Sequence, residues 1–327
     1  MNGLWNQRPV FITGCSGFLG SWLTQELLAC GADVIGLVRD WTQHSRLVTE
    51  GFRKRMTIVN GGVDDIQMLE RTLNEYNIDT VFHLAAQTQV TLANRHPLST
   101  LEVNIRGTWN MLEACRRVGC AKRIVVASSD KAYGYQARLP IEETSPLQGK
   151  HPYDVSKSCA DLIAQSYFHT YGLPVCITRF GNLFGGGDMN FQRLVPGTIQ
   201  SVLRGERPVI RSDGTFVRDY IYVRDAALAY ITLADRMLER GLVGEAFNFS
   251  LEKPLSAREM VDLVLDRMGC TNLECEVLNQ GQNEIPMQML SARKAREVLG
   301  WCPRYALEAA LDETIEWYRA CFQEAGK

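Results

Sequence analysis

Short apolar runs and longer segments with helical periodicity alternate along the first 180 residues. The apolar runs predict strands at residues 10–12, 33–38, 56–59, 80–84, 123–127 and 174–179. The periodic segments predict helices at residues 21–30, 64–77, 97–118 and 153–171. Strands and helices that alternate at this spacing are typical of a parallel, doubly wound sheet, so we assign the chain to the α/β class.

The first predicted strand runs into a turn with three glycines and then into a helix. Gly14 lets the chain turn, Gly17 removes a side chain where a pyrophosphate would approach the backbone, and Gly20 lets the helix pack closely on the strand. The helix N-terminus adds free N–H groups and a positive dipole end. Glycine-rich turns also occur for packing reasons, so this motif makes nucleotide binding a hypothesis that other residues must support.

Beyond residue 180 the chain becomes richer in Gly, Pro and Arg, and its predicted elements are shorter. They are strands at residues 209–210, 219–223 and 246–249 and helices at residues 257–268, 292–299 and 307–322. We therefore predict a Rossmann-type dinucleotide-binding domain at residues 1–180 and a smaller C-terminal α/β substrate lobe at residues 181–327. The strand at residues 219–223 and the helix after it are candidates to return to the main sheet. A second ligand is expected in the cleft between the two parts.

The second predicted strand ends on Val38, where a fold of this kind normally supplies an acid for the adenosine ribose. Arg39, helped by Arg46, could pair with a 2'-phosphate, which weakly favours NADP as the cofactor. Asp40 could instead reach a ribose hydroxyl, which favours NAD. A solvated Arg39–Asp40 pair is a third interpretation, so the predicted cofactor is NAD or NADP.

Composition narrows the choice of partners. The formal net charge of -2 over 327 residues favours neither nucleic acid nor an acidic membrane surface. No apolar run approaches the roughly 20 residues of a membrane span, and no signal peptide is visible, so we expect a cytoplasmic protein. The ten cysteines are scattered without a C-x-x-C pair, and we expect buried thiols and no metal site.

Three residues have the chemistry of a hydroxyl-oxidising site. Tyr153 and Lys157 are four apart on a predicted helix and therefore share a face. An ammonium group beside the phenol would lower its pKa and make Tyr153 usable as a base. Ser129, just past a predicted strand, would meet Tyr153 across the cleft and hold a substrate oxygen. Taken singly, a surface pair and a turn serine would explain the same residues.

Seven motifs lie between residues 13 and 225. They are Thr13-Gly-x-x-Gly-x-x-Gly20, His83-Leu-Ala-Ala, Asn104-x-x-Gly107-Thr108, Ser128-Ser129, Tyr153-x-x-x-Lys157, Arg179-Phe-Gly-Asn182 and Arg218-Asp-Tyr-Ile-Tyr-Val-Arg-Asp225. Together they resemble the extended short-chain dehydrogenase/reductases that act on nucleotide sugars. The resemblance implies Ser129, Tyr153 and Lys157 as a catalytic triad around a bound nicotinamide, and a nucleotide-diphosphate sugar as substrate.

The resemblance also implies which residues bind each ligand. For the tightly bound, recycled cofactor they are Thr13, Gly14, Ser16, Gly17, Phe18, Leu19, Gly20, Arg39, Asp40, Val63, Leu84, Ala85, Ala86, Gln87, Asn104, Tyr153 and Lys157. For the substrate they are Gln87, Ser129, Asn182, Arg193, Arg211 and Arg218. Gly62-Val63 stands where the family usually has an acidic and an aliphatic residue beside the adenine, which leaves the adenine hydrogen bond open.

Asp130 and Lys131 follow Ser129, where 4,6-dehydratases of this family place an acid–base pair, usually Asp-Glu, and epimerases place small uncharged residues; here the pair is Asp-Lys. Ser128-Ser129-Asp130-Lys131 and the segments 179–188 and 193–196 are similar to CDP-glucose 4,6-dehydratases. This implies that Lys131 removes the C5 proton and Asp130 protonates the departing C6 hydroxyl, giving a 4-keto-6-deoxy sugar. Lys131 could alternatively only orient Asp130 or a phosphate. A UDP-sugar 4-epimerase and a redox sensor without turnover are the other hypotheses.

The predicted helices at residues 97–118 and 153–171 carry more apolar surface than one sheet contact requires. The residues concerned are Trp109, Met111, Ile163, Tyr167 and Phe168. The family resemblance implies that these helices pair into a four-helix seam, so a homodimer is expected.

Overall fold

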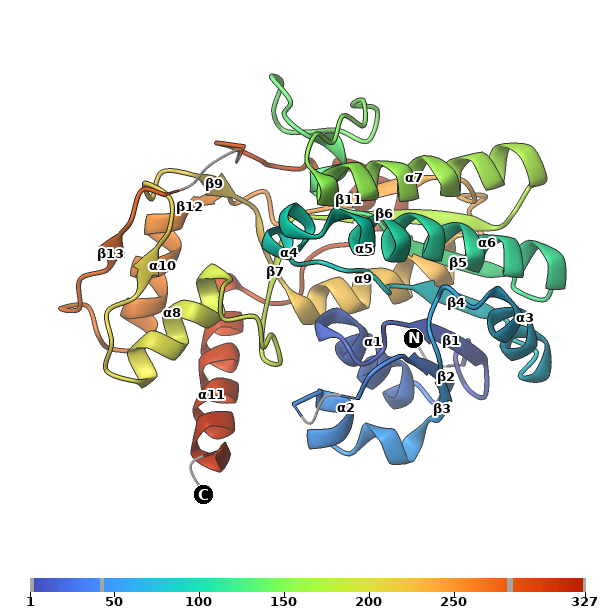
Figure 1. Cartoon of the computed structure of the whole chain (residues 1–327), viewed down its shortest axis with the longest axis horizontal. Coiled ribbons are helices and arrows are strands. Elements are labelled where there is room, and N and C mark those ends of the chain that lie inside the picture. Colours follow the sequence, from blue (N-terminus) through green and yellow to red (C-terminus); the bar gives the residue numbers. More distant parts are fainter. Residues whose placement is uncertain (1–2, 42–43, 281–284, 326–327) are drawn as a thin grey trace.

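The computed structural model describes residues 3–41, 44–280 and 285–325, and a parallel sheet of seven strands runs through its centre (Figure 1). The strands are β1 (Pro9–Thr13), β2 (Asp33–Val38), β3 (Thr57–Asn60), β4 (Thr80–His83), β5 (Arg123–Ala127), β6 (Val175–Phe180) and β11 (Ala246–Phe249). Their order across the sheet is β11-β6-β5-β4-β1-β2-β3, so the winding reverses between β1 and β4. The predicted doubly wound parallel sheet is confirmed, and its switch point is where such folds bind ligands.

Helices cover both faces of this sheet. Successive β1 side chains point to opposite faces: Val10 and Ile12 join one buried core, and Phe11 joins the other. The first core includes residues of α1 (Phe18–Ala29) and α9 (Val223–Arg236), which pack on each other. The second includes residues of α3 (Ile66–Glu75), α6 (Gly107–Val118) and α7 (Pro152–Tyr171).

The helix predicted at residues 97–118 contains an internal π-helical turn. It consists of α5 (Pro97–Leu101), the π-helical η2 (Glu102–Arg106) and α6, which follow one another without a break. The remaining short helices before the second lobe are α2 (Arg46–Thr49), η1 (Phe52–Arg55), α4 (Val90–Arg95) and η3 (Asp130–Tyr133).

The later part of the chain builds a smaller lobe, on the left in Figure 1. Its helices are α8 (Leu194–Leu203), α10 (Ala257–Arg267) and α11 (Leu307–Ala325). The π-helical η4 (Ala295–Leu299) instead contacts α9 and β11, beside the main sheet. Three two-stranded sheets pair β7 (Asn182–Phe184) with β10 (Tyr220–Tyr222), β9 (Val217–Arg218) with β12 (Leu255–Ser256), and β8 (Val209–Ile210) with β13 (Glu276–Val277).

The return of the chain to the main sheet differs from the expectation in one element. The strand predicted at residues 219–223 is β10, which pairs with β7 and not with the main sheet. The strand that returns is β11, hydrogen-bonded to β6 at the edge of the sheet. Helix α9 does return, as expected, and packs on α1. The division at residue 180 stays a prediction.

Within the described ranges, no helix is long and apolar enough to cross a bilayer. No group of three or more potential metal ligands is found among the same residues. The cysteines differ in burial: Cys15, Cys115, Cys176 and Cys275 are buried, Cys302 is exposed and the other five are half-buried. The expectation of buried thiols is therefore confirmed for those four residues and wrong for Cys302.

Candidate active site

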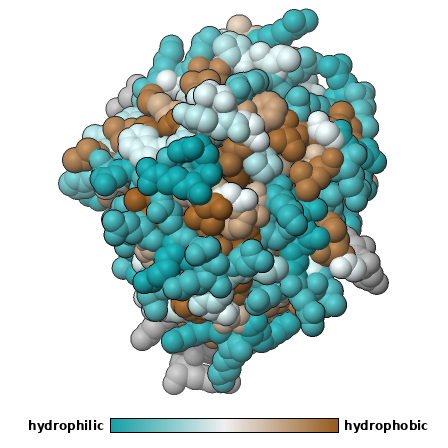
Figure 2. All heavy atoms as spheres, turned by 90° about the vertical axis from the view of Figure 1, so that its right-hand side faces the viewer, coloured by the Kyte–Doolittle hydropathy of each residue, from teal (hydrophilic) through white to brown (hydrophobic). Residues whose placement is uncertain are grey.

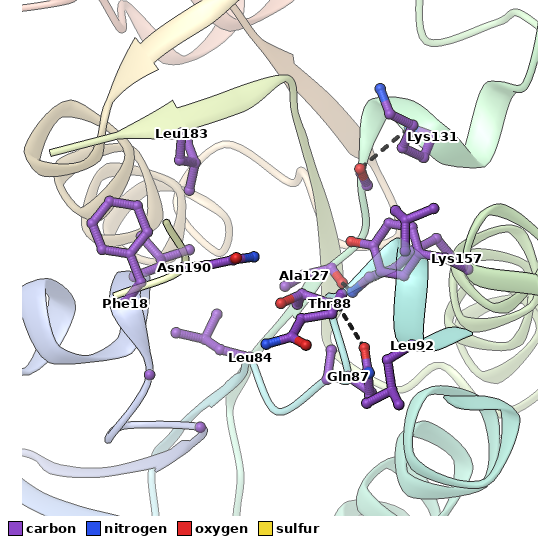
Figure 3. Close-up of a pocket in the computed structure, with 18 of the residues that line it drawn as sticks. Phe18, Leu84, Gln87, Thr88, Leu92, Ala127, Lys131, Lys157, Leu183 and Asn190 are labelled. Atoms are coloured by element: carbon purple, nitrogen blue, oxygen red, sulfur yellow. Dashed lines mark hydrogen bonds between the residues drawn. The ribbon is translucent and has the colours of Figure 1, made fainter. Parts of the chain in front are cut away.

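A cavity of ≈ 1530 Å³ lies at the carboxyl ends of the central strands and is lined by residues from both parts of the chain (Figure 3). In Figure 3, Phe18 and Leu84 lie across the cavity from Lys131 and Lys157. Apart from Thr13, Arg46 and Asn104, every residue predicted to contact a ligand lines this cavity. The fold therefore brings together motifs that are scattered over two hundred residues of sequence.

The glycine turn has no room for side chains at two positions. Gly14 has φ +74, and a Cβ there would lie 2.8 Å from the backbone N of Ala85. A Cβ at Gly20 would lie 2.1 Å from the carbonyl oxygen of Gly14. Gly17 is the N-cap of α1, and no side chain caps that helix end. The turn thus holds an uncapped helix N-terminus against the cavity, an arrangement that suits a phosphate group.

Thr13 and Asn104 lie behind the cavity wall and hold its backbone in place. Thr13 Oγ1 accepts a hydrogen bond from Ala85 N at 3.2 Å and lies 2.8 Å from His83 Nδ1. Asn104 accepts from Gln87 N at 2.7 Å and donates to Gln87 O at 3.0 Å. Burial lowers the pKa of His83 to about 3, so this imidazole is neutral.

At the end of β2, Arg39 and Asp40 form an exposed ion pair. Arg39 Nε lies 2.6 Å from Asp40 Oδ2, and both side chains are 69% exposed. Arg46 is buried away from this cavity: its guanidinium lies 3.7 Å from the centre of the Trp22 ring and donates to Glu50 at 2.5 Å. The expectation that Arg46 helps to bind a 2'-phosphate is therefore wrong.

Lys157 is buried at the start of α7, and Tyr153, one turn earlier, is half-buried and lines the cavity. Burial raises the pKa of Tyr153 to about 12, although the charge of Arg193 and a hydrogen bond with Ser129 oppose the rise. Burial lowers the pKa of Lys157 to about 8, and its Nζ donates to the carbonyl oxygen of Ala127 at 2.8 Å. The expected lowering of the Tyr153 pKa is thus wrong for the protein by itself, because desolvation prevails.

Ser129, Asp130 and Lys131 form a chain of hydrogen bonds beside Tyr153. Ser129 Oγ donates to Asp130 Oδ1 at 2.9 Å, and Lys131 Nζ donates to Asp130 Oδ2 at 3.1 Å. Lys131 Nζ also donates to Gln288 Oε1, and Gln288 Nε2 donates to the Asp130 carbonyl at 3.3 Å. Gln288 was missed by the sequence analysis, because nothing in its local sequence marks a residue that lies more than 150 positions from its partners.

The predicted substrate residues line the same cavity. They are Gln87, Ser129, Asn182, Arg193, Arg211 and Arg218. Arg193 donates to Asp188 Oδ2 at 2.9 Å, and Arg218 donates to the carbonyl oxygens of Val217 and Pro286. The cavity therefore offers several guanidinium groups to an anionic ligand, as a diphosphate requires.

A family model described as GDP-mannose 4,6 dehydratase matches residues 11–314 of this chain. The chain belongs to this family. The CDP-glucose 4,6-dehydratase of Salmonella typhimurium is 30% identical to it, over 97% of this chain and 92% of that protein. This confirms the predicted resemblance and favours an enzyme over a redox sensor.

Solved structures agree with this assignment to the GDP-mannose 4,6 dehydratase family. A UDP-glucose 4-epimerase of Thermotoga maritima, solved with UDP-glucose, has a TM-score of 0.88 at 26% identity and covers 96% of this chain and 99% of its own. A dTDP-glucose 4,6-dehydratase of Streptomyces venezuelae, solved with NAD, has a TM-score of 0.86 at 28% identity and covers 95% and 97%.

The geometry of this family member fits a dinucleotide. Close backbone contacts at Gly14 and Gly20 exclude side chains from the turn, and the N-terminus of α1 is uncapped beside the cavity. Backbone N–H groups left free in this way are the usual ligands of a pyrophosphate.

Proposed function

We propose that this chain is a nucleotide-sugar 4,6-dehydratase that converts CDP-glucose to CDP-4-keto-6-deoxyglucose. One observation carries the proposal: the Asp130–Lys131 ion pair, 3.1 Å long, is joined through Ser129 to the Tyr153 site. An oxidation site next to an acid–base pair suits a reaction that oxidises one carbon and eliminates water from its neighbours. The CDP-glucose 4,6-dehydratase of Salmonella typhimurium, 30% identical over 97% of this chain, supports the same activity.

The cofactor would be held by the glycine turn and the α1 N-terminus, with its nicotinamide near Tyr153 and Lys157, and it would supply the acceptor and later donor of a hydride. Ser129 would hold the C4 hydroxyl while Tyr153 takes its proton. Because burial raises the Tyr153 pKa to about 12, the phenolate needs nearby positive charge to form. The protein's own sources of that charge are Arg193, whose charge lowers the Tyr153 pKa, and the buried Lys157 ammonium one helical turn away.

Elimination would use the proton already shared by Asp130 and Lys131. Transfer of that proton from Nζ to the carboxylate creates a base and an acid in one step. Lys131 then takes the C5 proton, the C5–H electrons form the C5–C6 double bond, and the C6–O bond breaks. Asp130 protonates the departing hydroxyl to give water, which leaves Asp130 as the carboxylate and Lys131 as the ammonium. Hydride return to C6 would then be matched by return of a proton from Lys131 to C5, giving the 4-keto-6-deoxy product. The proton that Tyr153 took from the C4 hydroxyl replaces, through solvent, the one that Lys131 gave up.

A diphosphate would lie between the two parts of the chain, on Asn182 and Arg218 with Arg193 and Arg211 nearby. Such contacts recognise any nucleotide-diphosphate sugar, and the choice of cytidine rests on the likeness across residues 185–196. The test is product analysis after incubation with NAD and a panel of CDP-, UDP-, GDP- and dTDP-glucose. A CDP product lighter by one water supports the proposal. An isomer of equal mass from UDP-glucose would establish 4-epimerisation instead, and an inert protein would favour the sensor.

For the cofactor itself, we propose NAD. The weak preference for NADP depended on Arg39 and Arg46. However, Arg39 forms an ion pair with Asp40, and Arg46 is buried outside the cavity. The dehydratase of Streptomyces venezuelae was solved with NAD. A cytoplasmic location remains a prediction from the sequence.

We also propose a homodimer formed through α6 and α7. Trp109, Leu162 and Tyr171 on these helices are exposed, by 43%, 52% and 58%. Met111, expected on this surface, is instead buried in the core, so it cannot contribute. In Figure 2, hydrophobic residues gather in the upper half of the visible face, at the level of α6 and α7. Light scattering should give twice the mass of the chain, and Trp109→Glu should shift it towards the monomer; a monomeric wild type at micromolar concentration would refute the dimer.

A further inference from the structure

A segment far along the chain reaches into the cavity beside the catalytic pair. This strap, residues 285–291, is fixed on both sides of Gln288. Before Gln288, Val217 N donates to Pro286 O at 2.9 Å. After it, Ile141 N donates to Met289 O at 2.8 Å, and Leu290 N donates to Asp219 Oδ2 at 3.0 Å. The backbone of the strap therefore determines where the Gln288 side chain lies.

The Gln288 amide contacts both members of the catalytic pair. Its Oε1 accepts from Lys131 Nζ, and its Nε2 donates to the Asp130 carbonyl at 3.3 Å. The residue is 1% exposed, so water does not compete for these bonds. An amide cannot take up the proton that Asp130 and Lys131 share, which leaves Gln288 a role in orientation alone.

We propose that Gln288 is a positioning residue for Lys131, and that it acts in the elimination step and not in oxidation at C4. When the shared proton lies on Asp130, the neutral Lys131 amine keeps one N–H on Gln288 Oε1. That bond restricts rotation about Cε–Nζ and directs the nitrogen lone pair. Without it the amine samples orientations that cannot accept the C5 proton. This inference rests on the proposed dehydratase function.

The test is a single turnover of CDP-glucose by the NAD-loaded enzyme, wild type against Gln288→Met. Methionine has a similar size but lacks the amide's donor and acceptor. Oxidation at C4 is followed as the rise in absorbance of the reduced nicotinamide, and elimination with hydride return as its decay. We expect an unchanged rise and a decay about 10- to 100-fold slower, so that the reduced cofactor accumulates. Product formation measured by mass should slow by the same factor.

Gln136→Met is the matched control. Gln136 donates to Tyr133 O at 2.6 Å and to Pro146 O at 3.1 Å, just beyond η3, and it does not line the cavity. Both phases should match wild type in this variant. Should Gln288→Met not fold, Gln288→Glu carries the test: its carboxylate keeps the contact but retains the proton on Lys131, so the same accumulation is expected.

Two results would overturn the inference. One is a decay within twofold of wild type in the Gln288 variant; the other is an equal slowing of rise and decay, which indicates only a structural role. The wild-type product separates this failure from failure of the proposed function. If wild type yields an isomer of equal mass, the dehydratase proposal is wrong. If it yields the 4-keto-6-deoxy sugar, the results for the variants test only the role of Gln288.

Discussion

Backbone groups shape one half of the cavity, and side chains shape the other half. In the half proposed to bind the dinucleotide, the turn is shaped by backbone, and Gly14 and Gly20 leave no space for side chains. In the half proposed to be catalytic, side chains shape the site: Asp130, Lys131 and Gln288 hold one another by hydrogen bonds. Backbone geometry recognises a shape that many ligands share, whereas interlocked side chains commit the site to one reaction. Mutations should therefore have different consequences in the two halves.

The largest expected effect is the loss of chemistry without loss of binding. Tyr153→Phe removes the proton acceptor but keeps the ring, so turnover should fall by roughly 10²- to 10⁴-fold. Dinucleotide affinity, measured by calorimetry, should stay within about twofold. Tyr76→Phe, an exposed tyrosine that does not line the cavity, is the matched control. Near-normal turnover in Tyr153→Phe would refute its role as base.

Substitutions in the glycine turn should instead weaken dinucleotide binding and lower the stability of the protein. Alanine at position 20 gains up to about 1 kcal/mol of helix propensity, but its Cβ would lie 2.1 Å from Gly14 O. The backbone must move, and we expect a net loss of about 1–3 kcal/mol in unfolding free energy together with weaker dinucleotide binding. Gly17→Ala, whose Cβ would lie 3.2 Å from the same oxygen, should weaken binding with a smaller loss of stability. Denaturant titration and calorimetry measure both quantities, and equal stabilities for the two variants would contradict the packing argument.

His83 and Asp219, which lie behind different halves of the cavity, should make the stability of the protein change with pH in opposite directions. His83, behind the dinucleotide wall, has a pKa lowered from 6.5 to about 3 by burial, so the unfolded chain binds more protons in that window and stability rises with pH. Asp219, which anchors the strap, has a pKa raised from 3.8 to about 6 by burial. There the folded protein binds more protons, and stability falls as pH rises through that window.

Denaturation of wild type, His83→Gln and Asp219→Asn between about pH 4 and pH 7 separates the two contributions. The stability advantage of wild type over His83→Gln should grow as pH rises, and that over Asp219→Asn should shrink. Parallel curves for all three proteins would show that neither group titrates in this way.

The smallest expected effect concerns the cofactor's ribose. Asp40→Ala frees the Arg39 guanidinium, and because exposed ion pairs contribute at most about 1 kcal/mol, the affinity for NADP relative to NAD should rise no more than about fivefold. Asp33→Ala, at the opposite end of β2, should leave the ratio unchanged. Titration calorimetry with both dinucleotides measures it, and a fall in the ratio for Asp40→Ala would place Arg39 outside the 2'-phosphate site.

Much of the site was predictable because its motifs have local causes. A glycine turn between a strand and a helix, and a Tyr–Lys pair at helical spacing, can be recognised from a few neighbouring residues. Arg46 shows the limit of this reasoning: nothing in its neighbourhood indicates that it stacks on Trp22 inside the protein. The pKa of Tyr153 shows a second limit, because burial depends on what covers the phenol and not on Lys157 alone.

The sequence by itself determined the parallel sheet, the order of its helices and the residue types at the cavity, since hydrophobic period and glycine placement act over a few residues. Only the tertiary structure decided that β11, and not β10, completes the main sheet, because both are short apolar strands that differ in the neighbours available to them. It alone also placed Gln288 on Lys131, because that contact depends on a strap anchored to Val217 and Ile141, residues remote in sequence.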